Sequence, residues 1–241
     1  MDLNQILFGV YPYVALSVLA IGSVLRFDRE PYTWRTGSSQ LLRRKQLMTG
    51  SVLFHIGVLA IFGGHFVGLL TPVVVWDTLG VTHSAKQMLA IVAGGVAGAF
   101  ALVGGLLLLH RRLMDPRVRA NSSFADTAIL VMLMAQLLLG LATIPISLTH
   151  RDGHEMMKFM NWAQGVFTLR PGIADLVADV HWIFKAHLTL GLTILLVFPF
   201  TRLVHMLSAP IWYLNRRGWQ LVRTRRDMSV RKGPVRLDPA E

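Results

Sequence analysis

The stretch LFHIGVLAIFGGHFVGLL at residues 53–70 is apolar except for two histidines, His55 and His65, and it contains no Asp, Glu, Lys or Arg. The apolar run begins near residue 47, and about 20 such residues in a helix cross the roughly 30 Å of hydrocarbon in a bilayer. Burying two imidazoles there is costly unless something binds them. The stretch therefore predicts a membrane-spanning helix that carries two ligand-binding histidines.

The composition extends this prediction to the whole chain. Of the 241 residues, 53% are apolar and 15% are charged, and the mean hydropathy is +0.51, well outside the range of soluble domains. Alternating strand patterns typical of barrels are absent. We therefore expect an all-α integral membrane protein, a five-helix transmembrane bundle, with spans at residues 6–27, 47–70, 88–109, 127–148 and 182–207.

Lysine and arginine gather in the loops between the first two spans, between the third and fourth, and after the fifth, whereas residues 71–85 contain none. Because short loops rich in these residues stay in the cytoplasm, the N-terminus is predicted to be outside and the C-terminus inside. The formal charge of +11 then reflects topology, and it does not favour nucleic-acid binding. The chain opens without a basic segment, so we expect the first span to be retained.

The last span, FKAHLTLGLTILLVFPFTRLVH at residues 184–205, carries two further histidines, His187 and His205. Spans two and five run in opposite directions, so His55 is expected to face His205 on the inner side and His65 to face His187 on the outer side. The separations along the helix are roughly 15 Å on span two and roughly 27 Å on span five. Helical phase puts the span-five pair on one face, whereas the span-two pair lies about 80° apart, an offset that tilt must absorb.

Paired histidines favour a bis-histidine haem b. The chain has no cysteine, which excludes thiolate sites and leaves histidine as its only strong nitrogen ligand for iron. An imidazole that ligates iron can donate its other ring nitrogen to a backbone carbonyl. Zinc is less favoured, because no acidic residue lies beside the histidines within the spans. His181, about 36 Å along a helix from His205, is expected to be interfacial instead.

Several other residues allow two interpretations. Gly57, Gly64 and Gly68 form a stripe that either makes room for a porphyrin or packs helices closely. Lys86 either snorkels at the outer interface or hydrogen-bonds a quinol oxygen. Arg202 either pairs with a propionate of the inner haem or only follows the distribution of positive charge.

Three segments have local expectations of their own. The sequence MMKFMNWAQGVF at residues 156–167 is expected to form a short helix in the outer interface, or else a simple connector. Pro199 removes a backbone hydrogen bond to Leu195, which predicts a kink in span five. Residues 223–241 are basic with few apolar side chains and are expected to be flexible unless a partner orders them.

The residues also resemble a known family, the gamma subunits, or cytochrome b membrane anchors, of respiratory nitrate reductases. The resemblance extends to about residue 222 and departs in the tail beyond 223. It is carried by YPYVA, TWRTGSSQ, LFHIG, FGGHF, LLTP, AKQ, RRL, PRVRA, GLATIPIS, MMKFMNWAQ, FKAHLTLGLT and LVFPFTRLVH. It implies a five-span di-haem cytochrome b domain at residues 1–222, with a periplasmic N-terminus, a cytoplasmic C-terminus and a place in the bacterial inner membrane. Residues 223–241 then form a basic cytoplasmic tail.

The resemblance implies two haems b, an inner, proximal haem on His55 and His205 and an outer, distal haem on His65 and His187. It assigns quinol binding to Lys86, with Gly64 as a neighbour.

In such a complex, menaquinol or ubiquinol is oxidised near the outer haem, and electrons pass inward. They reach an iron–sulfur electron-transfer subunit on the cytoplasmic face and then a molybdenum-cofactor subunit that reduces nitrate. Three alternatives remain at this stage: an anchor of a formate dehydrogenase or hydrogenase, a haem-free anchor, and a transporter.

Overall fold

The computed structural model describes residues 2–34, 39 and 41–208, and these residues form helices, turns and loops without a β-strand. Within this part, five helices are long and apolar enough to cross a membrane. They lie at Leu3–Arg29, Arg44–Leu70, His83–Met114, Phe124–Thr149 and Trp182–Phe200. The five predicted apolar helices are thus confirmed, although most extend further than the hydropathy windows. The predicted tail 223–241 and the boundary at 222 lie outside the described residues.

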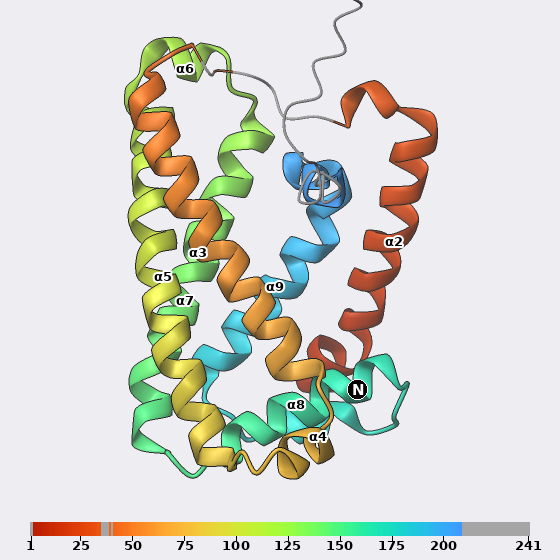
Figure 1. Cartoon of the computed structure of the whole chain (residues 1–241). Helices are drawn as coiled ribbons and strands as arrows, with labels where there is room; N and C mark the ends of the chain where they lie inside the picture. The colour runs from red at the N-terminus through yellow and green to blue at the C-terminus, as the bar shows by residue number, and fades with distance from the viewer. Residues whose placement is uncertain (1, 35–38, 40, 209–241) are drawn as a thin grey trace, which may run out of the picture. The chain divides into compact units, whose positions relative to one another are not determined.

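The first long helix contains a π-helical turn at Ile6–Val10 and continues as α2, Tyr11–Arg29. The others are α3 (Arg44–Leu70), α5 (His83–Met114), α7 (Phe124–Thr149) and α9 (Trp182–Val197). Each packs on its neighbours in a chain of contacts: α3 on α5, α5 on α7, α7 on α9 and α9 on α2 (Figure 1). Within the described residues, α3 and α9 are not among the closely packed pairs.

Helices α3 and α5 approach each other most closely, through glycines. A Cβ on Gly57 would lie 2.5 Å from the carbonyl oxygen of Ala97 and closer still to the Ala101 nitrogen. A Cβ on Gly104 would collide with the backbone of Phe54 in the same way. Small residues allow this close approach of backbones, which is a common way to join helices in a membrane.

Short elements cover one end of the bundle. They are α4 (Val73–Thr78), α8 (His154–Phe167) and the 3₁₀ turn Ile173–Val177, and they lie beside the start of the first helix (Figure 1). Trp162 of α8 is buried and donates its indole N–H to the carbonyl of Phe8 at 3.0 Å. The helix predicted within residues 156–167 is therefore confirmed, and it belongs to the core of this end.

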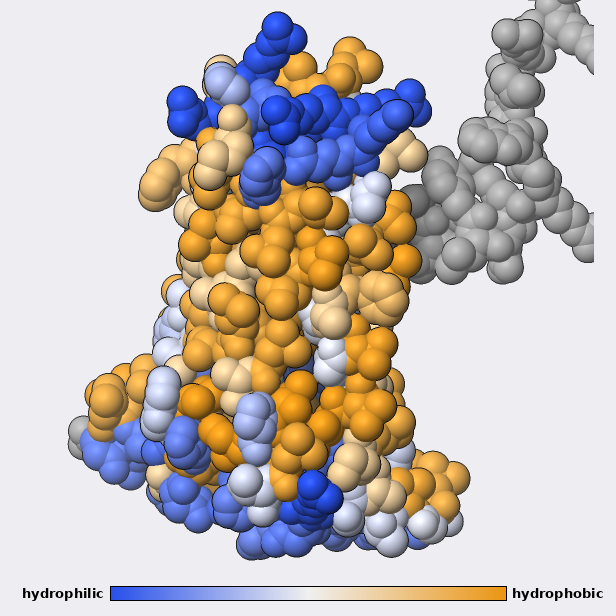
Figure 2. Space-filling view, turned by 90° about the vertical axis from the view of Figure 1, so that its left-hand side faces the viewer, coloured by the Kyte–Doolittle hydropathy of each residue, from blue (hydrophilic) through white to orange (hydrophobic). Residues whose placement is uncertain are grey.

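The opposite end carries α6, Pro116–Ala120, and the start of α3 (Figure 1). Figure 2 shows, on the face that it presents, an apolar band between two polar ends. Such a band is what a bilayer requires of a spanning bundle.

The fifth span ends earlier than the predicted limit of residue 207. The α-helix stops at Val197, the 3₁₀ turn Phe198–Phe200 follows, and Arg202–Ser208 forms a second 3₁₀ segment. Pro199 causes the break, because proline has no N–H and its ring clashes with the preceding turn. The kink expected there is a true helix end. The distance and phase counted for an unbroken helix from His187 to His205 were therefore wrong.

Candidate functional site

The four paired histidines come from two regions of the chain, α3 and the α9 region. The ring centroids of His55 and His205 are 6.3 Å apart, and those of His65 and His187 are 6.1 Å apart. The structure therefore brings the rings together in the pairs that the opposed directions of the two spans predicted. The two separations are nearly equal even though the helix carrying His205 is broken.

Three of these four rings are oriented by the backbone of their own segment. His55 donates its Nδ1–H to the carbonyl of Ser51 at 2.7 Å, and His65 donates to Ile61 at 2.9 Å. His205 donates to the carbonyl of Arg202 at 2.6 Å. A carbonyl can only accept, so Nδ1 carries the proton and Nε2 keeps its lone pair. This is the tautomer that a metal-ligating histidine needs.

His187 is held differently, by the neighbouring helix α7. Its Nδ1 is buried and finds no hydrogen-bond partner among the described residues. The Gln136 amide Nε2 donates to the His187 carbonyl at 3.1 Å and lies 3.4 Å from the ring Nε2. A Cβ on Gly140, one turn further along α7, would lie 3.0 Å from Cε1 of the ring. Helix α7 thus packs against the imidazole of His187.

The two histidine pairs have the spacing that a shared metal ion would impose. Two metal–imidazole bonds of about 2 Å, together with roughly 1 Å from each nitrogen to its ring centre, place the centroids about 6 Å apart. The donor set of each pair, two imidazole nitrogens from opposed segments, suits the two axial positions of haem iron. A Cβ placed on Gly63, Gly64 or Gly68 would meet no described atom within 4 Å. The backbone beside His65 is therefore unobstructed, and the residues fit a flat macrocycle.

The glycines of the α3 stripe do not all have the same surroundings. Gly57 packs against α5, as the helix-packing reading predicted, whereas Gly64 and Gly68 contact no neighbouring helix in the described part of the chain. Gly64 therefore has room for a ligand on its surface.

Lys86 lies in the first turn of α5 and is only 5% exposed. Its Nζ donates to the sulfur of Met160 in α8 at 2.7 Å and sits 4.5 Å from the centre of the Trp76 ring. These are weak partners for an ammonium, since a thioether is a poor acceptor and the ring offers a cation–π contact. Sequence analysis missed Trp76, and it noted Met160 only as part of an apolar segment.

Lys86, His65 and His187 belong to the same end of the bundle. Helix α8, which carries Met160, is tied to the end of α3 by Gln164. The Gln164 amide donates to the carbonyls of Leu69 and Thr71 at 3.0 and 3.1 Å. This end is therefore a connected layer of α3, α5 and α8.

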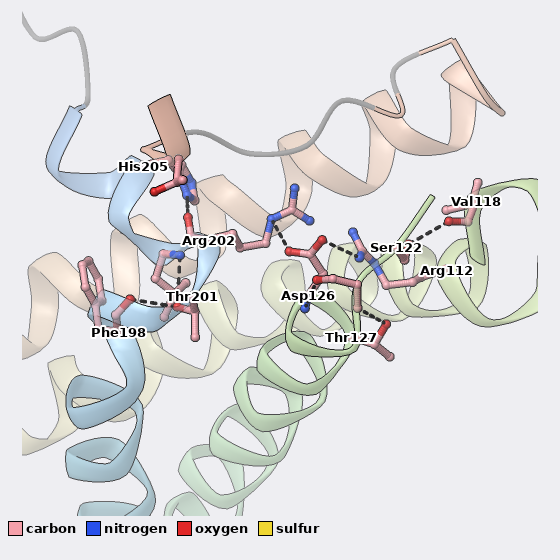
Figure 3. A network of polar contacts seen from close by, with 12 residues as sticks. Arg112, Val118, Ser122, Asp126, Thr127, Phe198, Thr201, Arg202 and His205 are labelled. Atoms are coloured by element: carbon pink, nitrogen blue, oxygen red, sulfur yellow. Dashed lines mark hydrogen bonds and ion pairs between the residues drawn. The ribbon is translucent and has the colours of Figure 1, made fainter. Parts of the chain in front are cut away.

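Arg202 lies at the other end, beside Asp126 of α7. Its Nε is 3.5 Å from one carboxylate oxygen of Asp126, and Arg112 lies 3.8 Å from the other (Figure 3). One carboxylate thus faces two guanidinium groups.

His181, which the sequence placed at the interface, caps the start of α9. Its Nδ1 accepts from the backbone N–H of Ile183 at 3.3 Å, and its side chain is exposed. It is therefore occupied as a helix cap and stands apart from the paired rings.

Charged groups outside the long helices form local pairs. At the Lys86 end, Lys158 donates to Asp179 at 2.8 Å and to Glu155 at 3.0 Å, and these hydrogen bonds raise the pKa of Lys158. At the other end, the backbone N–H of Val118 and then that of Arg117 hold the pKa of Asp115 below its usual value, with Arg43 adding to the effect.

Comparisons with known proteins place these features in a family context. A family model described as "Nitrate reductase gamma subunit" matches residues 4–225. The respiratory nitrate reductase 1 gamma chain of Escherichia coli K12 is 50% identical, over 92% of this chain and 98% of its own. The nitrate reductase gamma chain of Bacillus subtilis 168 is 36% identical, over 88% of this chain and 95% of its own.

Proposed function

This chain belongs to the nitrate reductase gamma subunit family, and from that membership we propose that it is the quinol-oxidising cytochrome b anchor of a respiratory nitrate reductase. The five apolar helices of its described part agree with a place in the bacterial inner membrane. The observation that carries the proposal is the two facing pairs of histidines, His55 with His205 and His65 with His187.

Each histidine pair would hold one haem b through its Nε2 atoms. When bound, the two haems supply one-electron carriers placed in series across the membrane. The residues do the positioning: Ser51, Ile61 and Arg202 accept Nδ1–H from three of the rings, which fixes both tautomer and orientation. Gln136 and Gly140 support the fourth ring, that of His187, from α7.

The orientation follows from the distribution of positive charge. The end that carries α6 and the loops rich in Arg and Lys faces the cytoplasm, and the end with α4 and α8 faces the periplasm. His65, His187 and Lys86 then form the outer site, whereas His55 and His205 form the inner one.

Lys86 would bind the quinol. Its ammonium is buried and, among the described residues, has only a thioether and an aromatic ring as partners, so a quinol oxygen is a better acceptor for its N–H groups. Oxidation of a quinol to a quinone releases two protons and two electrons. The protons would leave on the periplasmic side, and the haems held by the two histidine pairs would supply the carriers that take the electrons inward. Gly64, whose surface is open, lies next to His65 in the same region.

The cytoplasmic face would dock an iron–sulfur electron-transfer subunit, which passes electrons to a molybdenum-cofactor subunit where nitrate is reduced. Moving an electron toward the negative interior costs up to about 2.3 kcal/mol per 100 mV. A strongly oxidising acceptor such as nitrate supplies this energy. Separating protons outward from electrons inward contributes to the membrane potential.

The quinol role of Lys86 is tested by Lys86→Ala in the purified complex, with haem reduction by a quinol analogue followed by stopped-flow absorbance. We expect quinol-driven reduction to slow roughly 100-fold, in the range of lost positioned contacts, while dithionite still reduces both haems. Lys158→Ala is the matched control, because Lys158 lies at the same end but is paired with Glu155 and Asp179. An unchanged rate, or equal loss of haem from the complex, would show that Lys86 has another role.

A further inference from the structure

The helix break after Val197 removes the usual support for His205. Pro199 donates no hydrogen bond, and Thr201 has an extended backbone with φ −117° and ψ 178°. Beyond it, His205 lies on a short 3₁₀ segment instead of on α9. No continuous helix connects His205 to α9. The distance between His205 and His55 therefore depends on the contacts that hold the break in place.

Arg26 of α2 supplies that anchor. Its Nη1 donates to the carbonyl of Pro199 at 2.6 Å and to that of Thr201 at 2.9 Å. Its Nε and Nη2 donate to Thr33, to the hydroxyl at 3.2 Å and the carbonyl at 2.8 Å. One rigid, planar guanidinium thus joins two carbonyls exposed by the break to the turn that follows α2.

The backbone of α2 also packs closely against Pro199, at the break. A Cβ on Gly22, one turn before Arg26, would lie 2.9 Å from Cγ of Pro199. Tyr11 in the same helix bonds Thr193 of α9 through their hydroxyls, 2.9 Å apart. Helix α2 therefore packs along α9 and carries the Arg26 guanidinium directly to the break.

The carbonyl that Arg26 holds and the carbonyl that orients the imidazole belong to consecutive residues. Arg26 holds the carbonyl of Thr201, and the carbonyl of the next residue, Arg202, accepts the Nδ1–H of His205 at 2.6 Å. Asp126 holds the side chain of Arg202 from the α7 side, 3.5 Å away (Figure 3). The segment that carries His205 is thus fixed from two helices, neither of which contains a haem-ligand histidine.

We propose that Arg26 is a positioning residue for the inner histidine pair, through its hydrogen bonds to the carbonyls of Pro199 and Thr201. This proposal rests on the assignment of His55 and His205 as haem ligands. Arg26 differs from an ordinary cytoplasmic arginine because two of its bonds are made to the break itself. A lysine keeps the charge but lacks the planar fork that reaches both carbonyls and Thr33 together.

The test compares Arg26→Ala, Arg26→Lys and Arg29→Ala in the assembled complex. Arg29 is the matched control, since it lies one turn further along α2 and is exposed. The readouts are haem content and the electron paramagnetic resonance spectrum of each oxidised low-spin haem. We expect Arg26→Ala to retain the inner haem roughly tenfold more weakly and to alter its spectrum, with the outer haem unchanged. Arg26→Lys should give an intermediate effect and Arg29→Ala none.

Two results would contradict the role of Arg26 and leave the haem ligands unaffected. They are wild-type spectra for both haems in Arg26→Ala, and equal loss of both haems in the milder Arg26→Lys variant. A wild-type complex without a low-spin haem signal would overturn the assignment of the haem ligands, and this inference with it.

Discussion

At the level of single residues, the two histidine pairs differ in how their rings are fixed. His55, His65 and His205 each donate to a carbonyl three or four residues earlier, so the local backbone sets their orientation. In the described part of the chain His187 has no such bond, and Gln136 of α7 lies against it instead. The outer pair therefore depends on the packing of α7 on α9.

Asp115 gives a residue-scale prediction about pH. Backbone N–H groups of Val118 and Arg117, and then Arg43, hold its pKa below the usual value of about 3.9. A depressed pKa means that the carboxylate stabilises the fold above pH 4 and that this contribution is lost as pH falls through the lower, folded value. Asp115→Asn should therefore lower the thermal-unfolding midpoint of the complex by a few degrees at pH 7.

The difference in midpoint between wild type and Asp115→Asn should narrow as pH falls below about 4, because the carboxyl of the unfolded chain takes up its proton there and that of the folded protein follows at its lower pKa. Scanning calorimetry of both proteins from pH 7 to pH 3 measures this difference in midpoint. Asp28→Asn, at an exposed carboxyl of the same end, is the control and should leave the midpoint at pH 7 unchanged. A difference in midpoint that stays constant down to pH 3 would contradict the role of the carboxylate charge.

The pairing of the histidines was predictable from sequence, because opposed spans fix which residues meet. The surroundings of Lys86 were not. Its contacts with Met160 and Trp76 join three separate elements, and no periodicity in the chain places α8 over the start of α5. Whether Lys86 snorkels or is buried depends on that tertiary arrangement.

At the level of elements, the glycines of α3 show where sequence spacing is ambiguous. Gly57 and Gly64 belong to one predicted stripe, yet only Gly57 touches α5 in the described structure. Small residues serve both helix packing and ligand access, so spacing alone could not separate them. The break at Pro199 was foreseen as a kink, but sequence alone did not reveal that the α-helix ends at Val197, nor that Arg26 of another helix donates to the carbonyl of Pro199.

The α3–α5 contact gives the element-scale prediction. Gly57→Ala places a Cβ within 2.5 Å of the Ala97 carbonyl oxygen, so the two helices must move apart. We expect a loss of about 1–3 kcal/mol in the free energy of unfolding, the usual range for overpacking. Denaturant unfolding of the isolated subunit in detergent measures the change.

Gly94→Ala is the control in the same helix pair, since a Cβ on Gly94 would meet no described atom within 4 Å. It should be neutral or stabilising by up to about 1 kcal/mol, because alanine favours helix more than glycine does. Equal losses in the two variants would contradict the packing role of Gly57.

At the level of the whole molecule, the paired histidines and the distribution of charge together describe a route for electrons. In the proposed function, quinol would meet Lys86 at the end covered by α4 and α8, and the basic end would receive the cytoplasmic subunits. The five-helix architecture followed from hydropathy, and the proposed direction of the route rests on where Lys and Arg lie in the sequence.

The central claim is that the chain holds two haems b, each between one histidine of α3 and one from the α9 region. Redox-titrated haem spectra of four single variants, His55→Ala, His65→Ala, His187→Ala and His205→Ala, test it most directly. We predict two haems in the wild-type complex, loss of the same haem in His55→Ala and His205→Ala, and loss of the other in His65→Ala and His187→Ala. Loss of the same haem in His55→Ala and His65→Ala, or retention of both haems in all four variants, would contradict the account.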